Sequence, residues 1–187
     1  MTASSGKHPL GPARDVVRFW RDAGMAGWFG QSPAFDRAFR ERFLDLHEAA
    51  ARGECDDWAA TAEGALALLI LLDQFPRNAF RGTARMYGTD AQARRIARLA
   101  VDRGLDGQVE SALRLFFYLP FAHSEDLADQ RLSVRLNRRL GHPWVDHAQG
   151  HADIIERFGR FPHRNPLLGR RMTPQEQAFL DQGGFAG

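Results

Sequence analysis

Large apolar side chains recur at helical spacing along most of this chain, and that periodicity limits the folds open to it. Phe35, Phe39 and Phe43 follow one another at intervals of four residues, which places all three on one face of a helix. No segment alternates apolar and polar residues between hairpin turns, which is the pattern of a half-buried strand. The sequence therefore predicts an all-α fold.

About eight helices are expected, because capping residues open the periodic segments and glycine or proline ends them. They run approximately over residues 12–24, 33–53, 56–75, 89–104, 108–119, 124–141, 143–158 and 173–180. Pro76, Pro120 and Pro162 each follow an apolar helix, and they are 44 and 42 residues apart. A period in the forties is typical of arrays of antiparallel helix pairs, although a helical bundle without repeats also ends helices with proline.

Length and composition indicate an ordinary globular protein. We expect a flexible tail over residues 1–12 and one domain over residues 13–187. Cys55 is the only cysteine, so no internal disulfide can form, which suits a reducing compartment. The longest apolar run, Ala65 to Leu72, is too short to span a bilayer, and residues 1–12 lack the apolar stretch of a secretory signal. A cytoplasmic location without membrane contact is therefore expected.

The basic residues are nearly all arginine, and they almost balance the acidic ones. There are 25 Lys and Arg against 23 Asp and Glu, for a net charge of +2. Arginine suits phosphate and carboxylate ligands, but a GC-rich genome also favours arginine codons. Because no basic run or aromatic-spaced motif is present, nucleic-acid binding is not expected.

The stretch 116–130 changes abruptly from aromatic residues to ionisable ones after Pro120. Glu125 and Asp129 are four residues apart and can share one helical face with His123 nearby. A histidine and two carboxylates could do acid–base work or, as a less favoured option, hold a divalent metal. The structural alternative is that acidic residues in a first turn simply complement the helix dipole.

A second polar string, at residues 73–78, follows the most apolar helix. Asp73 lies in the last turn, where the helix dipole disfavours a negative charge, and it shares a face with buried leucines. A buried carboxylate must be paired. The partner is therefore either an arginine, such as Arg77 or Arg164, or a ligand.

Two further groups of basic residues complete the candidates. His147 and His151 are four residues apart, as in zinc sites, but the glutamate of the zincin motif is missing, and His151 lies on an apolar stripe. A hydrogen-bonded core histidine is the favoured interpretation of His151. The segment 157–171 is rich in arginine and could hold an anion, although cations are also favourable at a helix end.

Three strings, at residues 72–78, 118–125 and 157–165, together resemble a bacterial family of unknown function, domain of unknown function 924. The resemblance extends from about Val16 to Leu180. It implies a tetratricopeptide-like right-handed helical array or bundle, and it carries no established activity. The chain departs from the family pattern at Ala122, where that pattern predicts a larger polar residue. The matching residues are Asp73, Gln74, Arg77, Asn78, His123, Ser124, Glu125, Arg160, His163, Arg164 and Asn165.

Three functions stay open for one polar pocket. In the favoured one, the pocket binds a small anionic ligand or an acidic peptide, with arginines as anion clamps. In the second, it is an acid–base or metal-assisted hydrolase, with His123, Glu125 or Asp73 as catalytic candidates and His123, Glu125 and Asp129 as candidate metal ligands. In the third, the strings form a structural polar network. The predicted ligand-binding residues are Asp73, Gln74, Arg77, Asn78, His123, Ser124, Glu125, Arg160, His163 and Arg164.

The sequence identifies no cofactor and no particular partner beyond that anionic ligand class. Trp28 and Phe29 are aromatic residues in an expected loop. They could serve a homodimer interface or belong to the core.

Overall fold

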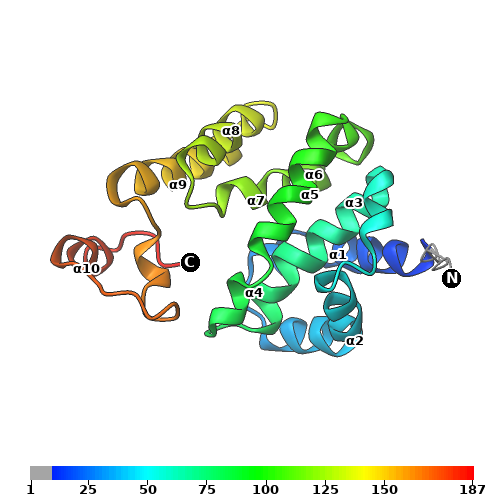
Figure 1. The fold of residues 1–187 in the computed structure, drawn as a ribbon, viewed down its shortest axis with the longest axis horizontal. Coiled ribbons are helices and arrows are strands. Elements are labelled where there is room, and N and C mark those ends of the chain that lie inside the picture. Colours follow the sequence, from blue (N-terminus) through cyan, green and yellow to red (C-terminus); the bar gives the residue numbers. More distant parts are fainter. Residues whose placement is uncertain (1–9) are drawn as a thin grey trace, which may run out of the picture. The chain divides into compact units, whose positions relative to one another are not determined.

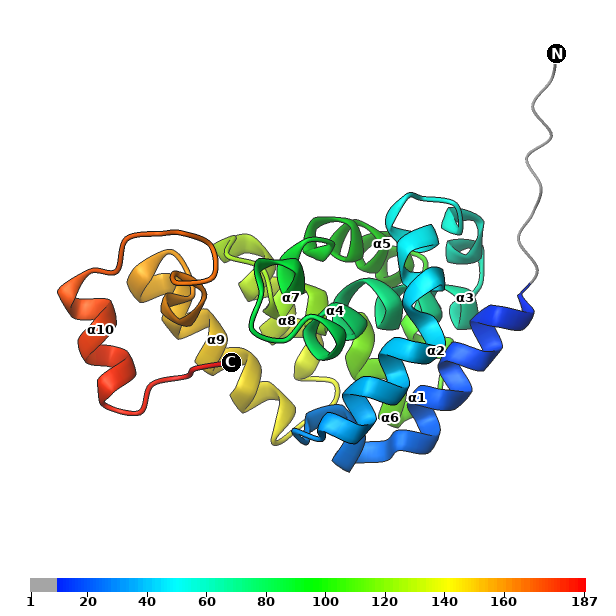
Figure 2. The same ribbon diagram turned by 90° about the horizontal axis from the view of Figure 1, so that it is seen from below.

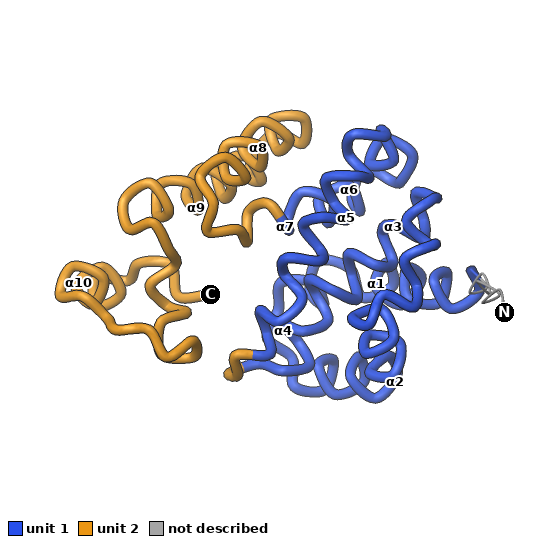
Figure 3. The backbone as a smooth tube through the Cα atoms, viewed as in Figure 1, with its two compact units in different colours: residues 1–81, 85–120 blue, residues 82–84, 121–187 orange. Residues whose placement is uncertain are grey.

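The computed structural model describes residues 10–187, and in this range there are helices and no β-strand, so the predicted all-α fold is confirmed. Most of the tail expected over residues 1–12 lies outside the described residues, and the first helix already begins at Gly11. The chain divides into two units (Figure 3). Unit 1 comprises the chain up to Arg81 and Arg85–Pro120, and unit 2 comprises Gly82–Ala84 and Phe121–Gly187. The expectation of one domain over residues 13–187 stays a prediction.

Unit 1 combines the long helices α1 (Gly11–Phe29), α2 (Pro33–Ala51) and α5 (Asp90–Asp102) with shorter helical segments (Figure 1). The shorter segments are η1 (Asp56–Ala60), α3 (Ala62–Leu69), η2 (Ile70–Gln74), α4 (Phe75–Ala79), η4 (Leu105–Gln108), α6 (Ser111–Arg114) and η5 (Leu115–Phe117). Two elements, η3 (Ala84–Tyr87) and α7 (Leu119–Ala122), include residues of both units. The helix expected over 108–119 begins only at Ser111, because the backbone is extended at Val109, and it is divided into α6 and η5.

The core of unit 1 is built on the apolar run that the sequence marked as central. Every residue from Ala65 to Leu72 is at most 1% exposed. Aromatic rings bridge the neighbouring helices α1 and α2, which lie side by side (Figure 2). Phe19 of α1 stacks on Phe35 and Phe39 of α2, with ring centroids 5.5 and 5.4 Å apart. The predicted phenylalanine face of α2 is thus an interhelical contact.

Pro76 does not end its helix, contrary to the sequence prediction. The turn Ile70–Gln74 is a π-helix, in which the Phe75 N–H donates to the Ile70 carbonyl. This wider turn accommodates the proline ring, and the chain continues as α4 to Ala79. Pro120 and Pro162 likewise lie within or at the start of short helical segments, α7 and η6. The three prolines therefore follow breaks or widened turns rather than mark helix ends.

Gly24 interrupts α1 without ending it. Its φ of 57° and ψ of −168° kink the helix, and one further turn follows to Phe29. This turn replaces the expected loop and brings Trp28 against Trp20 and Phe116 of unit 1, with centroids 6.4 and 5.0 Å apart. Trp28 is thus part of the aromatic packing, whereas Phe29 is 48% exposed. A homodimer stays a prediction.

Two helices begin later than their sequence signals suggested. Thr61, rather than Asp56 or Asp57, caps α3 by accepting a hydrogen bond from the Gly64 N–H. Asp126, rather than Ser124, caps α8 by accepting from the backbone of Ala128 and Asp129. In both cases a short turn lies between the first acceptor along the chain and the helix: η1 before α3, and residues 124–125 before the Asp126 cap. Such a turn gives the sequence several competing cap residues.

Unit 2 consists of a helix pair followed by a polar loop and a final helix. Its elements are α8 (Leu127–Asn137), α9 (Trp144–Phe158), η6 (Pro162–Arg164) and α10 (Pro174–Asp181). Helices α8 and α9 pack side by side through Val134, Ala148 and Ala152 (Figure 1). The capping box at Thr173 and Glu176 is present as predicted and fixes the start of α10.

The tetratricopeptide-like array and the expected helix pairing stay predictions. Across residues 10–187, none of the helices has both the length and the apolar character needed to cross a membrane.

Candidate functional site

In unit 1 the polar string at 73–78 forms a buried ion-pair network around Arg77. Asp73 is 1% exposed, accepts a hydrogen bond from Gln74 at 2.6 Å and lies 3.4 Å from the Arg77 guanidinium. Arg77 also donates to both carboxylate oxygens of Asp90, at 2.8 and 3.0 Å. Burial acts to lower the pKa of Arg77, but the charges of Asp73 and Asp90 outweigh it and raise that pKa. We call Asp73, Arg77 and Asp90 the Arg77 network.

Asn78 belongs to a neighbouring contact on α2. Its side-chain amide donates to Asp36 at 2.7 Å, and Arg81 forms an ion pair with the same carboxylate at 3.1 Å. Asp36 lies in the first turn of α2. The predicted residue Asn78 therefore joins α4 to the start of α2.

In unit 2, Glu125 is held by an arginine that the sequence did not single out. Arg170 donates to both of its carboxylate oxygens, at 2.7 and 2.9 Å, and the Phe161 N–H donates at 2.8 Å. Burial acts to raise the pKa of Glu125, but these hydrogen bonds and the charges of Arg170 and Arg164 outweigh it, so the pKa is lowered. The sequence signal that could have pointed to Arg170 is its place in the arginine-rich segment 157–171.

Arg160 makes a similar fork with Glu176 of the α10 capping box. The two hydrogen bonds measure 2.6 and 2.9 Å, and Glu176 is 2% exposed. The hydrogen bond from Arg160 is the main cause that lowers the pKa of Glu176 from 4.5 to about 2. This predicted anion clamp is therefore already engaged with a carboxylate of the chain itself.

Ser124 belongs to a buried hydrogen-bonded turn at the start of α8. Its hydroxyl donates to Asp129 at 2.8 Å, and Gln130 donates to the carbonyls of Ala122 and Ser124 at 2.8 and 2.6 Å. The contact at position 122 is made by the backbone. The departure from the family pattern at Ala122 therefore leaves this hydrogen bond intact.

A cluster of histidines and one arginine surrounds Phe161 in unit 2. The Arg164 guanidinium lies 4.5 Å from the centroid of the Phe161 ring, and the centroids of the His151 and His163 rings lie 5.6 and 5.7 Å from it. Phe185, near the end of the chain, contacts both histidine rings, with centroids 4.7 and 5.2 Å away. We call these three side chains, together with His123, whose charge acts on His151, the histidine–arginine cluster.

The pKa of His151 reflects the burial and the basic neighbours of this cluster. Burial is the main cause that lowers its pKa from 6.5 to about 3. The other causes are nearby basic groups, namely His123, Arg164, His147 and His163. His151 is therefore neutral at neutral pH, as expected for a half-buried histidine. The sequence predicted a hydrogen-bonded core histidine here rather than a site residue, but the buried Nδ1 of His151 has no hydrogen-bond partner among residues 10–187.

The predicted site residues divide between the two units. Asp73, Gln74, Arg77 and Asn78 belong to unit 1, and the residues from His123 onward belong to unit 2. Within residues 10–187, no three His, Cys, Asp or Glu side chains are grouped so that they could hold a metal ion. The metal-ligand roles of His123, Glu125 and Asp129 stay predictions. The catalytic candidates Asp73 and Glu125 are both held by arginines, and their catalytic roles stay predictions.

Comparison with known proteins places the chain among proteins without an assigned activity. Residues 16–184 match the family model described as bacterial protein of unknown function (DUF924). A solved structure of a protein of unknown function from Agrobacterium tumefaciens is similar, with 54% sequence identity and a TM-score of 0.90. The similarity covers 92% of this chain and 98% of that one. No curated protein matches.

Proposed function

This chain belongs to the DUF924 family of bacterial proteins of unknown function, and we propose from its own residues that it binds a small anionic ligand at the histidine–arginine cluster of unit 2. The observation that carries the proposal is the gathering of His151, His163 and Arg164 around one aromatic ring, Phe161. Each of these side chains offers N–H donors to an anion.

Two of the other predicted anion clamps are already paired with carboxylates of the chain itself. Arg77 is engaged with Asp73 and Asp90, and Arg160 with Glu176. A second anion would have to displace a carboxylate of the chain, with a large desolvation cost for the displaced group. Arg77 and Arg160 are therefore weaker candidates for an anion site.

The electrostatic environment of His151 supports an anionic rather than a cationic ligand. Every residue that shifts its pKa is basic, and each acts to lower the pKa. The charge of Arg164 also acts on the Glu125 carboxylate, which accepts two hydrogen bonds from Arg170. A phosphate or carboxylate would thus gain charge-assisted hydrogen bonds in a partly buried setting, where they are strongest.

The hydrolase alternative has less support from these side chains. A general base works best when its pKa lies near the operating pH. The pKa of His151 is about 3, and the pKa of Glu125 is lowered by its ion pair with Arg170. Both groups are therefore unprotonated but weakly basic at neutral pH.

Calorimetric titration at pH 7 with orthophosphate and with succinate tests the proposal. We expect saturable binding of at least one of these probes. His163→Gln and Arg164→Gln should each weaken it by about tenfold or more, since a hydrogen bond to a charged group contributes about 1.5–3 kcal/mol. His142→Gln is the matched control, because His142 is an exposed histidine of unit 2 paired with Asp146.

Two results would overturn the proposal. One is that the unmodified protein binds neither probe. The other is that His163→Gln and His142→Gln bind with the affinity of the unmodified protein. Thermal unfolding provides an independent readout, because a ligand present at a hundred times its Kd adds about 2.7 kcal/mol of apparent stability.

A further inference from the structure

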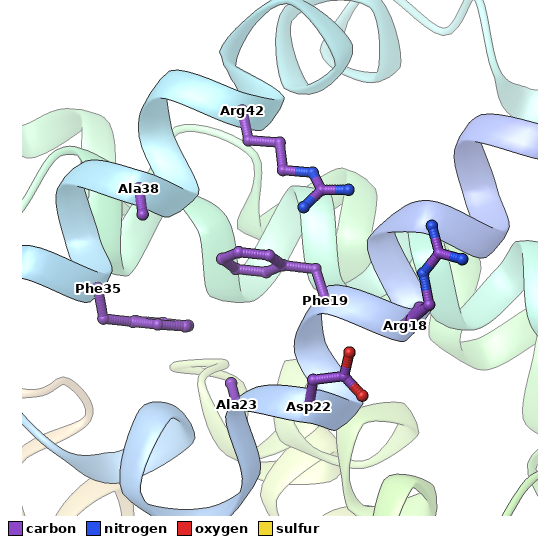
Figure 4. Close-up of a pocket in the computed structure, with 7 residues that line it drawn as sticks. All are labelled: Arg18, Phe19, Asp22, Ala23, Phe35, Ala38 and Arg42. Carbon is purple, nitrogen blue, oxygen red and sulfur yellow. The ribbon is translucent and has the colours of Figure 1, made fainter.

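A pocket of about 300 Å³ opens between α1 and α2, within unit 1 (Figure 4). Its size is at the lower end of the range for small-molecule sites, about 300–1,000 Å³. Both helices contribute apolar and charged side chains to it. The lining residues are Arg18, Phe19, Asp22, Ala23, Phe35, Ala38 and Arg42.

The apolar part of the pocket is aromatic and rigid. Phe19 projects from α1 toward α2, with the Arg42 guanidinium above its ring and the Asp22 carboxylate on the opposite side (Figure 4). Its ring is held by stacking on Phe35 and Phe39 at 5.5 and 5.4 Å. A flat apolar ligand would therefore meet a preformed surface rather than one that must be ordered on binding.

Arg42 presents its hydrogen-bond donors to this pocket. Its guanidinium lies 5.6 Å from the Phe19 centroid and 5.3 Å from the Phe43 centroid. Among residues 10–187 it makes no hydrogen bond or ion pair. Arg42 is exposed, and a planar guanidinium that contacts aromatic rings keeps its edge N–H donors for a carboxylate.

Arg18 is the second cation at the pocket, and it is only partly engaged. It forms one ion pair with Asp15, and the two side chains are 64% and 49% exposed. A guanidinium has five N–H donors, so Arg18 retains donors for a ligand. Because the exposed pair is worth about 1 kcal/mol or less, a ligand carboxylate can compete with Asp15.

We propose that this pocket binds a flat aromatic monocarboxylate, with its ring against Phe19 and Phe35 and its carboxylate at Arg42 and Arg18. The aromatic lining favours a ligand with a ring over an inorganic anion. The nearby negative charge of Asp22 disfavours a dianion such as a phosphate monoester. A peptide is disfavoured because the pocket walls are helices, whose backbone groups already pair within the helix.

This site is independent of the function proposed above. It belongs to unit 1, whereas the histidine–arginine cluster belongs to unit 2. The failure of either proposal leaves the other standing, because an NMR titration reports separately on the backbone amides of the two sets of residues.

Titration of isotope-labelled protein with 2-naphthoate, followed by amide and arginine Nε NMR signals, tests the proposal. We expect saturable shifts centred on residues 18–42, with a Kd of about 0.1–10 mM, as small ligands of this size allow. The neutral analogue 2-naphthamide and naphthyl phosphate should each bind about tenfold more weakly or worse, because the first lacks the charge and the second is a dianion.

Variants locate the binding within the pocket. Arg42→Gln should weaken naphthoate binding by about tenfold, since a charge-assisted hydrogen bond is lost. Arg37→Gln, at an exposed arginine of α2 outside the pocket lining, should leave the affinity unchanged. Ala38→Leu should block the pocket, and Ala34→Leu, at an exposed alanine of the same helix outside the lining, should not.

Three results would overturn the proposal. The first is that naphthoate shifts no signal of residues 18–42. The second is that Arg42→Gln binds it as well as the unmodified protein does, and the third is that naphthamide binds equally well. Circular dichroism and the thermal midpoint of each variant establish that the fold is retained, so that a loss of binding reports on the pocket.

Discussion

Arg77 donates two hydrogen bonds to Asp90, at 2.8 and 3.0 Å, and thereby joins α4 to the first residue of α5. The same guanidinium reaches the side chain of Asp73 and donates to its carbonyl at 2.7 Å. The two acidic side chains are 13% and 1% exposed, so this is a mostly buried network.

Removal of Asp90 should therefore destabilise the protein. Asp90→Ala leaves Arg77 buried with one carboxylate partner instead of two. We expect a loss of about 3 kcal/mol in the free energy of unfolding, as for other broken buried pairs. Urea denaturation at pH 7 measures it. As a control, Arg14→Ala removes a pair whose side chains are 70% and 44% exposed, and it should cost about 1 kcal/mol or less. Equal losses for the two variants would contradict the prediction.

Glu176 should make stability depend on pH in the acid range. Its pKa is lowered from 4.5 to about 2, chiefly by the hydrogen bond from Arg160. A carboxyl whose pKa is depressed by folding contributes its stabilisation fully above its unfolded pKa, and loses it as the pH falls toward the folded value. The stability difference between the unmodified protein and Glu176→Gln should thus shrink from pH 4.5 to pH 2.

Denaturation curves at pH 2, 3, 4.5 and 7 test this expectation. Glu156→Gln, at an exposed residue of α9, controls for the loss of a negative charge on unit 2. A difference between the unmodified protein and Glu176→Gln that stays constant over this range would be inconsistent with an ion pair at Arg160.

His151 should make the stability of the protein depend on pH over a higher range than Glu176 does. Its folded pKa is about 3, because burial disfavours the charged ring, whereas its ordinary pKa is 6.5. As the pH falls below 6.5, the unfolded chain binds a proton that the folded protein does not, so stability is lost by up to about 1.4 kcal/mol per pH unit. His151→Gln removes this contribution and should lose less stability than the unmodified protein between pH 6.5 and pH 4.

The test compares unfolding free energies at pH 4, 5, 6 and 7. His142→Gln, which removes an exposed histidine of the same unit, controls for the substitution itself. Identical slopes for His151→Gln and the unmodified protein would show that His151 becomes charged in the folded state as readily as in the unfolded chain.

Two glycines in helices should respond in opposite directions to alanine. At Gly64 a Cβ atom would lie 2.2 Å from the Trp58 carbonyl oxygen, so Gly64→Ala should force the η1 turn away from α3 and destabilise the protein. At Gly150 of α9 nothing lies within 4 Å of a Cβ atom. Gly150→Ala should therefore stabilise the protein by about 0.4–1 kcal/mol through helix propensity. Chemical denaturation of the two variants measures both signs, and a stabilised Gly64→Ala would contradict the structure.

Local signals in the sequence predicted much of the fold. Ser32 and the Thr173 capping box open their helices as expected, because a cap depends on residues within one turn. Gly104 and Gly159 end α5 and α9 in the left-handed conformation that glycine favours. The burial of Ala65 to Leu72 also followed from its composition.

The partners of the polar residues could not be predicted in the same way. Arg170 and Glu125 are 45 residues apart, and Arg160 and Glu176 are 16 apart. Such pairs depend on how helices and loops pack, which no local pattern encodes. With several arginines in the same segment, the sequence could not distinguish those that bind the chain's own carboxylates from those available to a ligand.

The π-helical turn at Ile70–Gln74 has a consequence for rotational register. An α-helix advances about 100° per residue, so a turn that takes in one extra residue rotates everything after it by about that angle relative to everything before it. The direction in which Asp73, Gln74 and Arg77 point thus depends on the number of residues in this turn. Deletion of one residue between Ile70 and Leu72 should restore a regular helix and turn Arg77 away from Asp90, although every side chain of the network would still be present.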